Sequence, residues 1–154
     1  TNFLWTVLLG AGIKVGLDPN VLAKVMGAGC ALGAMAVTYH LAGHLRGFRT
    51  LPCVATWLLA TTIVFSGYAV FGLETPLLLM FFALNLHALL TGAGWRQLGI
   101  AWAGMMWTRP DAFIFIGASL AGMFVFGCAD GAQRRTLLSQ AWRAGLLCTV
   151  LYAP

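Results

Sequence analysis

Three ionisable residues stand out because each interrupts a long apolar run. Glu74 is the only acid between Asp18 and Asp111, and it lies in the segment Gly72–Pro76. Arg109 precedes Asp111 by two positions. An arginine can hold a phosphate through two parallel hydrogen bonds, and carboxylates accept hydrogen bonds from hydroxyl groups or bind a divalent cation. We therefore predict that Glu74, Arg109 and Asp111 line a substrate site.

Each of these residues also has a purely structural interpretation. Glu74 could simply stabilise a helix N-terminus, which typically contributes under about 1 kcal/mol. Arg109 could close a turn by pairing with Asp111 or Glu74. Trp107 lies beside Arg109 and could stack on a sugar ring, as could Trp5, although tryptophan at a membrane interface is ordinarily an anchor.

The histidines and cysteines give no clear metal site. His40 and His44 lie four positions apart, a helical spacing that permits metal binding, but they are far in sequence from the acids. We interpret them as interface histidines. Asn85 and His87 are interpreted as buried polar residues that bridge helices. The four cysteines show neither zinc spacing nor a disulfide framework.

The composition is that of a membrane protein. Hydrophobic residues make up 60% of the chain and charged residues 8%, with a mean hydropathy of +0.87, whereas soluble domains carry roughly 25% charged residues. No charged residue occurs in 50–73, 75–95 or 112–129. Each of these stretches is long enough to cross about 30 Å of hydrocarbon as a helix, and a lipid environment favours helices. The scattered basic residues argue against a nucleic-acid partner.

We therefore predict an all-α, polytopic membrane helical bundle with about five transmembrane helices and one surface helix. Residues 1–17 are predicted to form the interfacial helix, and 18–154 the membrane helices. Within the second part we expect spans at 18–44, 51–68, 76–90, 98–107 and 112–128, a polar basic stretch at 130–143, and the start of a further span at 145–154. The chain starts abruptly at Thr1 and stops at Pro154 inside an apolar run. We therefore expect 1–154 to be one segment of a larger membrane domain, truncated at both ends.

Local signals place the helix starts and one packing face. Asp18 before Pro19 is typical of an N-cap followed by proline at the first helical position, and Thr75 before Pro76 suggests the same arrangement. Gly29 and Gly33 form a small-xxx-small pair that predicts close helix packing.

The basic turns predict the orientation. If the arginines at 46, 49, 96, 134, 135 and 143 face the cytoplasm, alternation of the spans places Asp18, Glu74 and Asp111 together on the external face. Arg109 joins them there.

Four segments in order carry a resemblance to a known family. They are Thr1-Asn2-Phe3-Leu4-Trp5, Gly16-Leu17-Asp18-Pro19, Gly72-Leu73-Glu74-Thr75-Pro76-Leu77 and Thr108-Arg109-Pro110-Asp111. Their order and spacing resemble bacterial GT-C membrane glycosyltransferases of the mycobacterial terminal arabinofuranosyltransferase type. The resemblance covers nearly the whole chain, and the third and fourth segments are its most specific part.

This resemblance implies a function at the external face of the bacterial cytoplasmic (inner) membrane, in a multi-pass protein. A sugar would pass from a polyprenyl-phosphate donor to a glycan or lipid acceptor of the cell envelope, by inversion and without a nucleotide. The family's catalytic base is an Asp in an external loop expected before Thr1, so no base is assigned here and the segment alone is expected to be inactive. Glu74, Arg109 and Asp111 carry over as cavity-lining residues. Glu74 or Asp111 would also bind a divalent cation if the reaction uses one.

Two other functions remain open from the sequence. A transporter or channel segment would use Glu74, Arg109 and Asp111 as an intramembrane pathway. A non-catalytic membrane assembly protein would use them only as ion pairs.

Overall fold

Helices make up most of the chain in its computed structural model. The structure describes residues 2–44, 50–92, 94–129 and 131–152, with side chains described outside 126–135. The elements are α1 (Phe3–Lys14), α2 (Pro19–His44), α3 (Leu51–Thr61), α4 (Ile63–Val70), α5 (Thr75–Thr91), α6 (Trp95–Thr108), the 3-10 turn η1 (Pro110–Ala112), α7 (Phe113–Ala129) and α8 (Gly131–Tyr152). No strand occurs among these residues. The predicted all-α class is confirmed.

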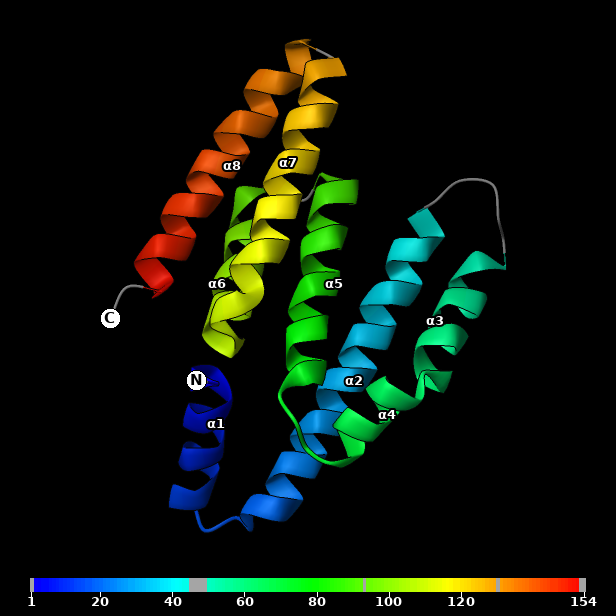
Figure 1. Cartoon of the computed structure of the whole chain (residues 1–154), viewed down its shortest axis with the longest axis vertical. Helices are drawn as coiled ribbons and strands as arrows, with labels where there is room; N and C mark the ends of the chain where they lie inside the picture. The colour runs from blue at the N-terminus through cyan, green and yellow to red at the C-terminus, as the bar shows by residue number, and fades with distance from the viewer. Residues whose placement is uncertain (1, 45–49, 93, 130, 153–154) are drawn as a thin grey trace.

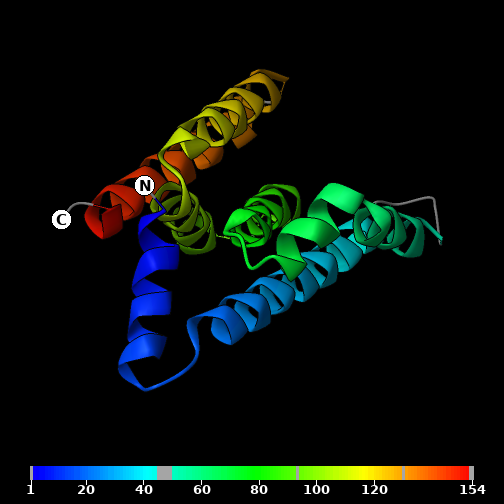
Figure 2. The same cartoon turned by 60° about the horizontal axis from the view of Figure 1, so that its bottom comes forward.

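The helices run up and down in an open bundle (Figure 1). α5 lies in the middle, between α2 on one side and α6 on the other, and α8 packs against both α6 and α7. α1 diverges from α2 below the rest (Figure 2). Because the helices run up and down, α2, α5 and α7 all begin toward the lower end in Figure 1, where α6 ends.

Two separate cores hold this arrangement. The first lies among α5, α6, α7 and α8 around the buried side chains of Trp102 and Met105. The second joins α2 to α4 through Ala31, Ala34 and Phe65. Small residues dominate the second core, so the helix backbones approach closely there instead of being separated by large side chains.

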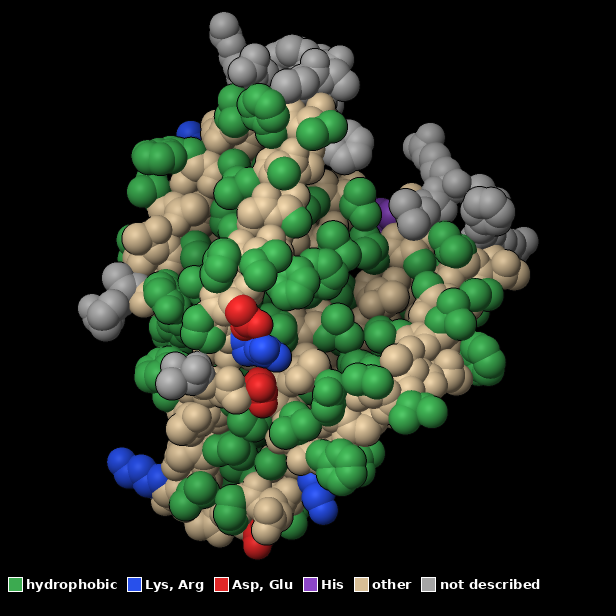
Figure 3. Space-filling model, viewed as in Figure 1, with side chains coloured by type: hydrophobic (Ala, Val, Ile, Leu, Met, Phe, Trp, Pro, Cys, Tyr) green, Lys and Arg blue, Asp and Glu red, His purple; other side chains and the backbone are tan. Residues whose placement is uncertain are grey.

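Much apolar surface is left uncovered. A compact soluble monomer of 16.4 kDa would expose about 7,500 Å², whereas this chain exposes 9511 Å². Large hydrophobic side chains stay open, including Ile63 at 83%, Phe71 at 76% and Trp142 at 70% exposure. Figure 3 shows hydrophobic side chains spread over the whole visible face. Such a surface needs lipid or other apolar partners to cover it.

Among the described residues, α2 is the one helix long and apolar enough to cross a membrane by itself, and the bent pair α3–α4 is a second candidate. α1, α5 and the stretch 110–125 are shorter apolar helices. One or two helices of this kind are weak evidence for membrane association, and the predicted number of five spans therefore stays a prediction.

The stretch expected to span at 51–68 is not one continuous helix, and whether it spans stays a prediction. The chain bends by 62° between α3 and α4, where Thr62 adopts an extended conformation (φ −68°, ψ 109°). The hydroxyls of Thr61 and Thr62 donate to the carbonyls of Trp57 and Leu58 at 2.9 and 2.8 Å. Threonine hydroxyls that bond to backbone carbonyls one turn back offer an alternative to the helical ladder and favour a bend.

The division of the C-terminal region is also corrected. A polar stretch at 130–143 and a separate span from 145 were expected, but 131–152 forms one helix, α8. Arg143 is twelve residues into it, which is about 18 Å along the axis, so Arg143 does not lie at the basic end with Arg134 and Arg135. The expected basic turn at Arg46 and Arg49 lies outside the described residues.

Of the predicted glycine pair, only Gly33 lies in a close helix contact, and the closest backbone approach occurs beside the pair. Around Gly29 there is open space, and Gly33 meets only the flexible side chain of Met80. At Gly27, in contrast, an added Cβ would lie 2.6 Å from the carbonyl oxygen of Ala69 and 3.3 Å from Cα of Gly72. Gly27 therefore lets α2 contact the backbone of α4 and the turn that follows it.

Candidate functional site

The turn that carries Glu74 is fixed by backbone contacts with α2. Gly72 has a positive φ of 68°, and a Cβ there would lie 2.8 Å from Ala23 of α2. Only glycine satisfies both the left-handed conformation and this close approach. The short α4–α5 connection is therefore held in place without any polar contact from Glu74.

Glu74 itself is half-buried, and its side chain has no polar partner among the described residues. Its backbone carbonyl accepts hydrogen bonds from the N–H groups of Leu77 and Leu78 at 3.0 and 3.1 Å, as the first turn of α5 requires. Its side chain makes no capping bond and no ion pair with any described residue. The predicted N-cap at Thr75 is wrong, because α5 begins at Thr75 and Glu74 takes the preceding position.

Arg109 and Asp111 form the one charged pair that the described side chains contain. Nε and Nη2 of Arg109 donate to the two oxygens of Asp111 at 3.0 and 2.9 Å. The pair is open to its surroundings, with side-chain exposures of 40% and 55%. Arg109 ends α6 in an extended conformation, and Pro110 and Asp111 begin the turn η1 before α7.

The three predicted residues occupy the same end of the bundle. Glu74 precedes α5, while Arg109 and Asp111 connect α6 to α7, and these helix ends lie together at the lower part of Figure 1. Figure 3 shows acidic and basic side chains next to one another over this region, surrounded by hydrophobic surface. We call this group of Glu74, Arg109 and Asp111 the charged cluster. It opens to the outside instead of being sealed within the bundle.

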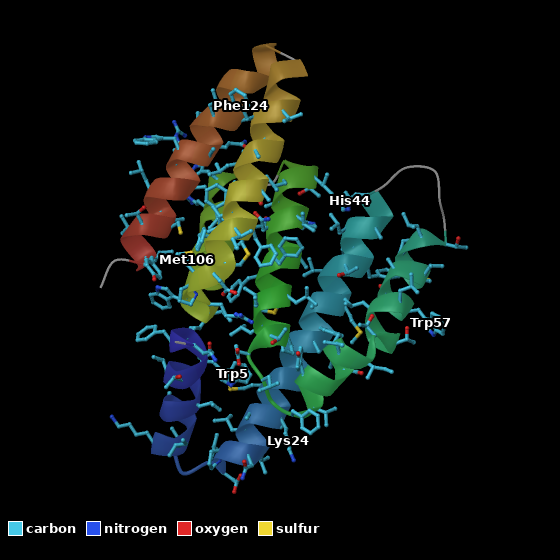
Figure 4. The ribbon with its side chains drawn as sticks, in the orientation of Figure 1. Trp5, Lys24, His44, Trp57, Met106 and Phe124 are labelled. Carbon is cyan, nitrogen blue, oxygen red and sulfur yellow. The ribbon has the colours of Figure 1, made fainter. Side chains whose placement is uncertain are left out.

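The two tryptophans considered for sugar stacking have different surroundings. Trp107 is half-buried and meets Phe3 of α1 edge-on, with ring centroids 5.7 Å apart. Trp5 is only 6% exposed, and Figure 4 shows it on α1 toward the rest of the bundle. Trp5 is therefore part of the packing, and Trp107 is the aromatic residue that remains beside the charged cluster.

Asp18 performs the local role predicted for it. One oxygen of Asp18 accepts hydrogen bonds from the N–H groups of Asn20 and Val21 at 2.8 and 3.0 Å. The predicted N-cap of α2 is thus confirmed, and Pro19 is its first residue. The carboxylate of Asp18 therefore has a structural role at this cap.

A buried polar network links α5, α6 and α7 above the charged cluster. Trp102 Nε1 donates to Asn85 Oδ1 at 2.8 Å, and Asn85 Nδ2 donates to Ser119 Oγ at 2.8 Å. Ser119 in turn donates to the carbonyl of Phe115. The prediction that Asn85 bridges helices is confirmed. Its partners were missed, because a tryptophan and a serine on apolar helices carry no distinguishing sequence signal.

An apolar groove of about 490 Å³ lies elsewhere, between α6, α7 and α8. Its lining includes Trp102, Leu120, Trp142 and Leu146. None of the residues of the charged cluster lines it, so the groove and the cluster are separate features of the surface.

Comparison with protein-family models, curated proteins and solved structures gives no match.

Proposed function

We propose that this chain is an integral membrane segment, with about five spans and α1 at the surface, in the bacterial cytoplasmic membrane. The support comes from the large hydrophobic side chains left exposed and from a total accessible surface of 9511 Å², about 2,000 Å² more than that of a compact soluble monomer. The seventeen-residue helices α5 and α7 reach about 25 Å each, which is close to the hydrocarbon thickness.

We further propose that the charged cluster binds the head group of a polyprenyl-phosphate-linked sugar, in a membrane glycosyltransferase that transfers this sugar to an envelope glycan or lipid. The observation that carries the proposal is the combination, at one end of an apolar bundle, of an exposed Arg109 guanidinium with the unpartnered carboxylate of Glu74. Arg109 would hold the phosphate bidentately. Glu74 would accept hydrogen bonds from sugar hydroxyls.

The surrounding helices favour an anion in the same place. The N-termini of α5 and α7 both lie at this end, and the positive ends of helix dipoles stabilise negative charge. When the phosphate binds, Asp111 would release Arg109 and join Glu74 in binding hydroxyls or a divalent cation. Trp107 would offer an aromatic surface beside the sugar. The base that deprotonates the acceptor is not among these residues.

Binding of a polyprenyl monophosphate to the purified chain in lipid nanodiscs tests the site without requiring transfer. Loss of a charged hydrogen-bonding partner costs about 1.5–3 kcal/mol, so Arg109→Ala should weaken binding by at least about tenfold. Lys24→Ala is the matched control, because Lys24 is an exposed cation that lies toward the same end of the bundle (Figure 4). Equal affinities for the two variants, or equal binding of the uncharged polyprenol, would refute the phosphate site.

A non-catalytic assembly protein is the second candidate, and the bidentate Arg109–Asp111 pair favours it. In that case the pair would only fix the α6–α7 turn, and neither Arg109→Ala nor Glu74→Gln would change lipid binding. The transporter alternative has less support, because Glu74, Arg109 and Asp111 all lie at helix ends and not along the interior of a helix.

A further inference from the structure

Two histidines from different helices meet at the end of the bundle opposite the charged cluster. His44 is the last residue of α2, and His87 lies one turn before the end of α5. Their ring centroids are 5.8 Å apart and the ring planes are nearly perpendicular, at 88°. Figure 4 places His44 at the upper end of α2, beside the upper end of α5.

The hydrogen bond of His44 determines which nitrogen is available. Its Nδ1 lies 2.8 Å from the backbone carbonyl oxygen of His40. A carbonyl only accepts, so Nδ1 must carry the proton, and Nε2 of the neutral ring is left with a free lone pair. Histidines that bind metals commonly donate their other ring N–H to a backbone carbonyl in this way.

The separation of the rings matches a shared metal ion. Imidazole nitrogens bind zinc at about 2.0–2.1 Å, so two rings on one tetrahedral ion have centroids roughly 5 Å apart. The observed 5.8 Å is close enough that small side-chain rotations would bring both rings onto one ion.

His87 has an outer partner of its own. The side-chain amide nitrogen of Gln97, from the first turn of α6, lies 3.5 Å from His87 Nδ1. Rotating this amide by 180° would present its oxygen to a protonated Nδ1, and the two amide orientations are nearly equivalent in shape. Nε2 of His87 would then be free for a metal, as in His44.

The ligand types select the kind of ion. The C-termini of α2 and α5 favour positive charge here, whereas the N-terminus of α6, whose first turn holds Gln97, opposes it. Imidazole suits zinc, copper and nickel, whereas magnesium and calcium prefer oxygen ligands. Within the described residues, no third His, Cys, Asp or Glu joins the pair, so water would complete the coordination.

We propose that His44 and His87 form a two-histidine site for a divalent transition-metal ion, which clamps the end of α2 to α5. This site is independent of the polyprenyl-phosphate proposal, because it uses none of the residues of the charged cluster. Gln97 is a positioning residue that holds the ring of His87.

Zn²⁺ titration calorimetry of the purified chain in nanodiscs tests the proposal. His44→Ala and His87→Ala should each weaken Zn²⁺ binding by about tenfold or more, since even loss of an outer partner costs roughly 10–100-fold. His40→Ala is the matched control, because the variant keeps the carbonyl that holds His44 and removes only the other imidazole on α2. Its affinity should stay within about twofold of wild type.

Two results would overturn the site. One is absence of Zn²⁺ binding by the wild-type chain. The other is that His40→Ala weakens Zn²⁺ binding as much as His44→Ala does, while His87→Ala leaves it unchanged. That pattern would assign the metal to α2 alone. Electron paramagnetic resonance of the wild-type chain with Cu²⁺ provides a check that does not depend on variant folding. It should show two equatorial nitrogen ligands, and a spectrum with one or none would count against the pair.

Discussion

Two glycines of α2, two residues apart, should respond oppositely to the same substitution. Gly27→Ala would place a Cβ 2.6 Å from the carbonyl oxygen of Ala69, where ordinary contacts are 3.4–4 Å, and the three nearest atoms are all backbone. Gly29→Ala would place its Cβ in open space. Replacing glycine by alanine inside a helix contributes about 0.5–1 kcal/mol of stability in either case.

The cost of overpacking therefore equals the difference in unfolding free energy between the two variants. Inserting a methyl group into a filled site costs typically 1–3 kcal/mol. Gly27→Ala should be less stable than Gly29→Ala by about this amount, with Gly29→Ala at or slightly above wild type. Equilibrium unfolding in mixed detergent micelles with increasing dodecyl sulfate, followed by circular dichroism, measures the free energies. Equal stabilities for the two variants would refute the contact between α2 and the backbone of α4.

Three further changes test the polar network, the charged cluster and the membrane surface. Asn85→Leu should cost about 1–3 kcal/mol of unfolding free energy, because it leaves the Trp102 N–H buried without an acceptor; adding Trp102→Phe should recover part of that loss, and no recovery would argue against the bond. Asp111→Asn should change the free energy of unfolding by less than about 1 kcal/mol, as expected for an exposed pair. It should also tighten binding of polyprenyl monophosphate, because it frees Arg109. Weaker binding would contradict the role of Arg109 in holding the phosphate. Ile63→Cys, at a position 83% exposed, should react in vesicles with a lipid-soluble maleimide but not with a charged one, and equal labelling by both would place α4 in water.

The positions of the helices were largely predictable from the sequence, because charged residues and prolines mark where apolar runs stop. The start of α2 follows from Asp18 and Pro19, and the break after Trp107 follows from Arg109 and Pro110. The bend at Thr62 was not predictable in this way. It contains neither proline nor glycine and depends on hydroxyl bonds to carbonyls within an apolar helix, a pattern that many straight helices also contain.

The candidate site was predictable as a set of residues but not as a set of partners. Rare charges in apolar sequence are easy to notice, and Glu74, Arg109 and Asp111 do share one end of the bundle. Which of the two carboxylates pairs with Arg109 depends on rotamers of the α6–α7 turn, which composition does not encode. The meeting of His44 with His87 likewise depends on the packing of α2 against α5, since 43 positions separate them in the chain.

The way in which Glu74 is held bears on what it can do. Its turn is fixed by the contact of Gly72 with Ala23 and by the close approach at Gly27, so no polar bond of the carboxylate is needed to keep it in place. A carboxylate positioned by backbone packing can take up a hydroxyl or a cation without loosening its own helix. Arg109, in contrast, must give up Asp111 to bind a phosphate, and since that exposed pair is worth at most about 1 kcal/mol, the exchange is energetically small. The charged cluster thus combines a fixed acceptor with a readily exchanged donor, and this combination supports the proposed binding and release of a charged head group.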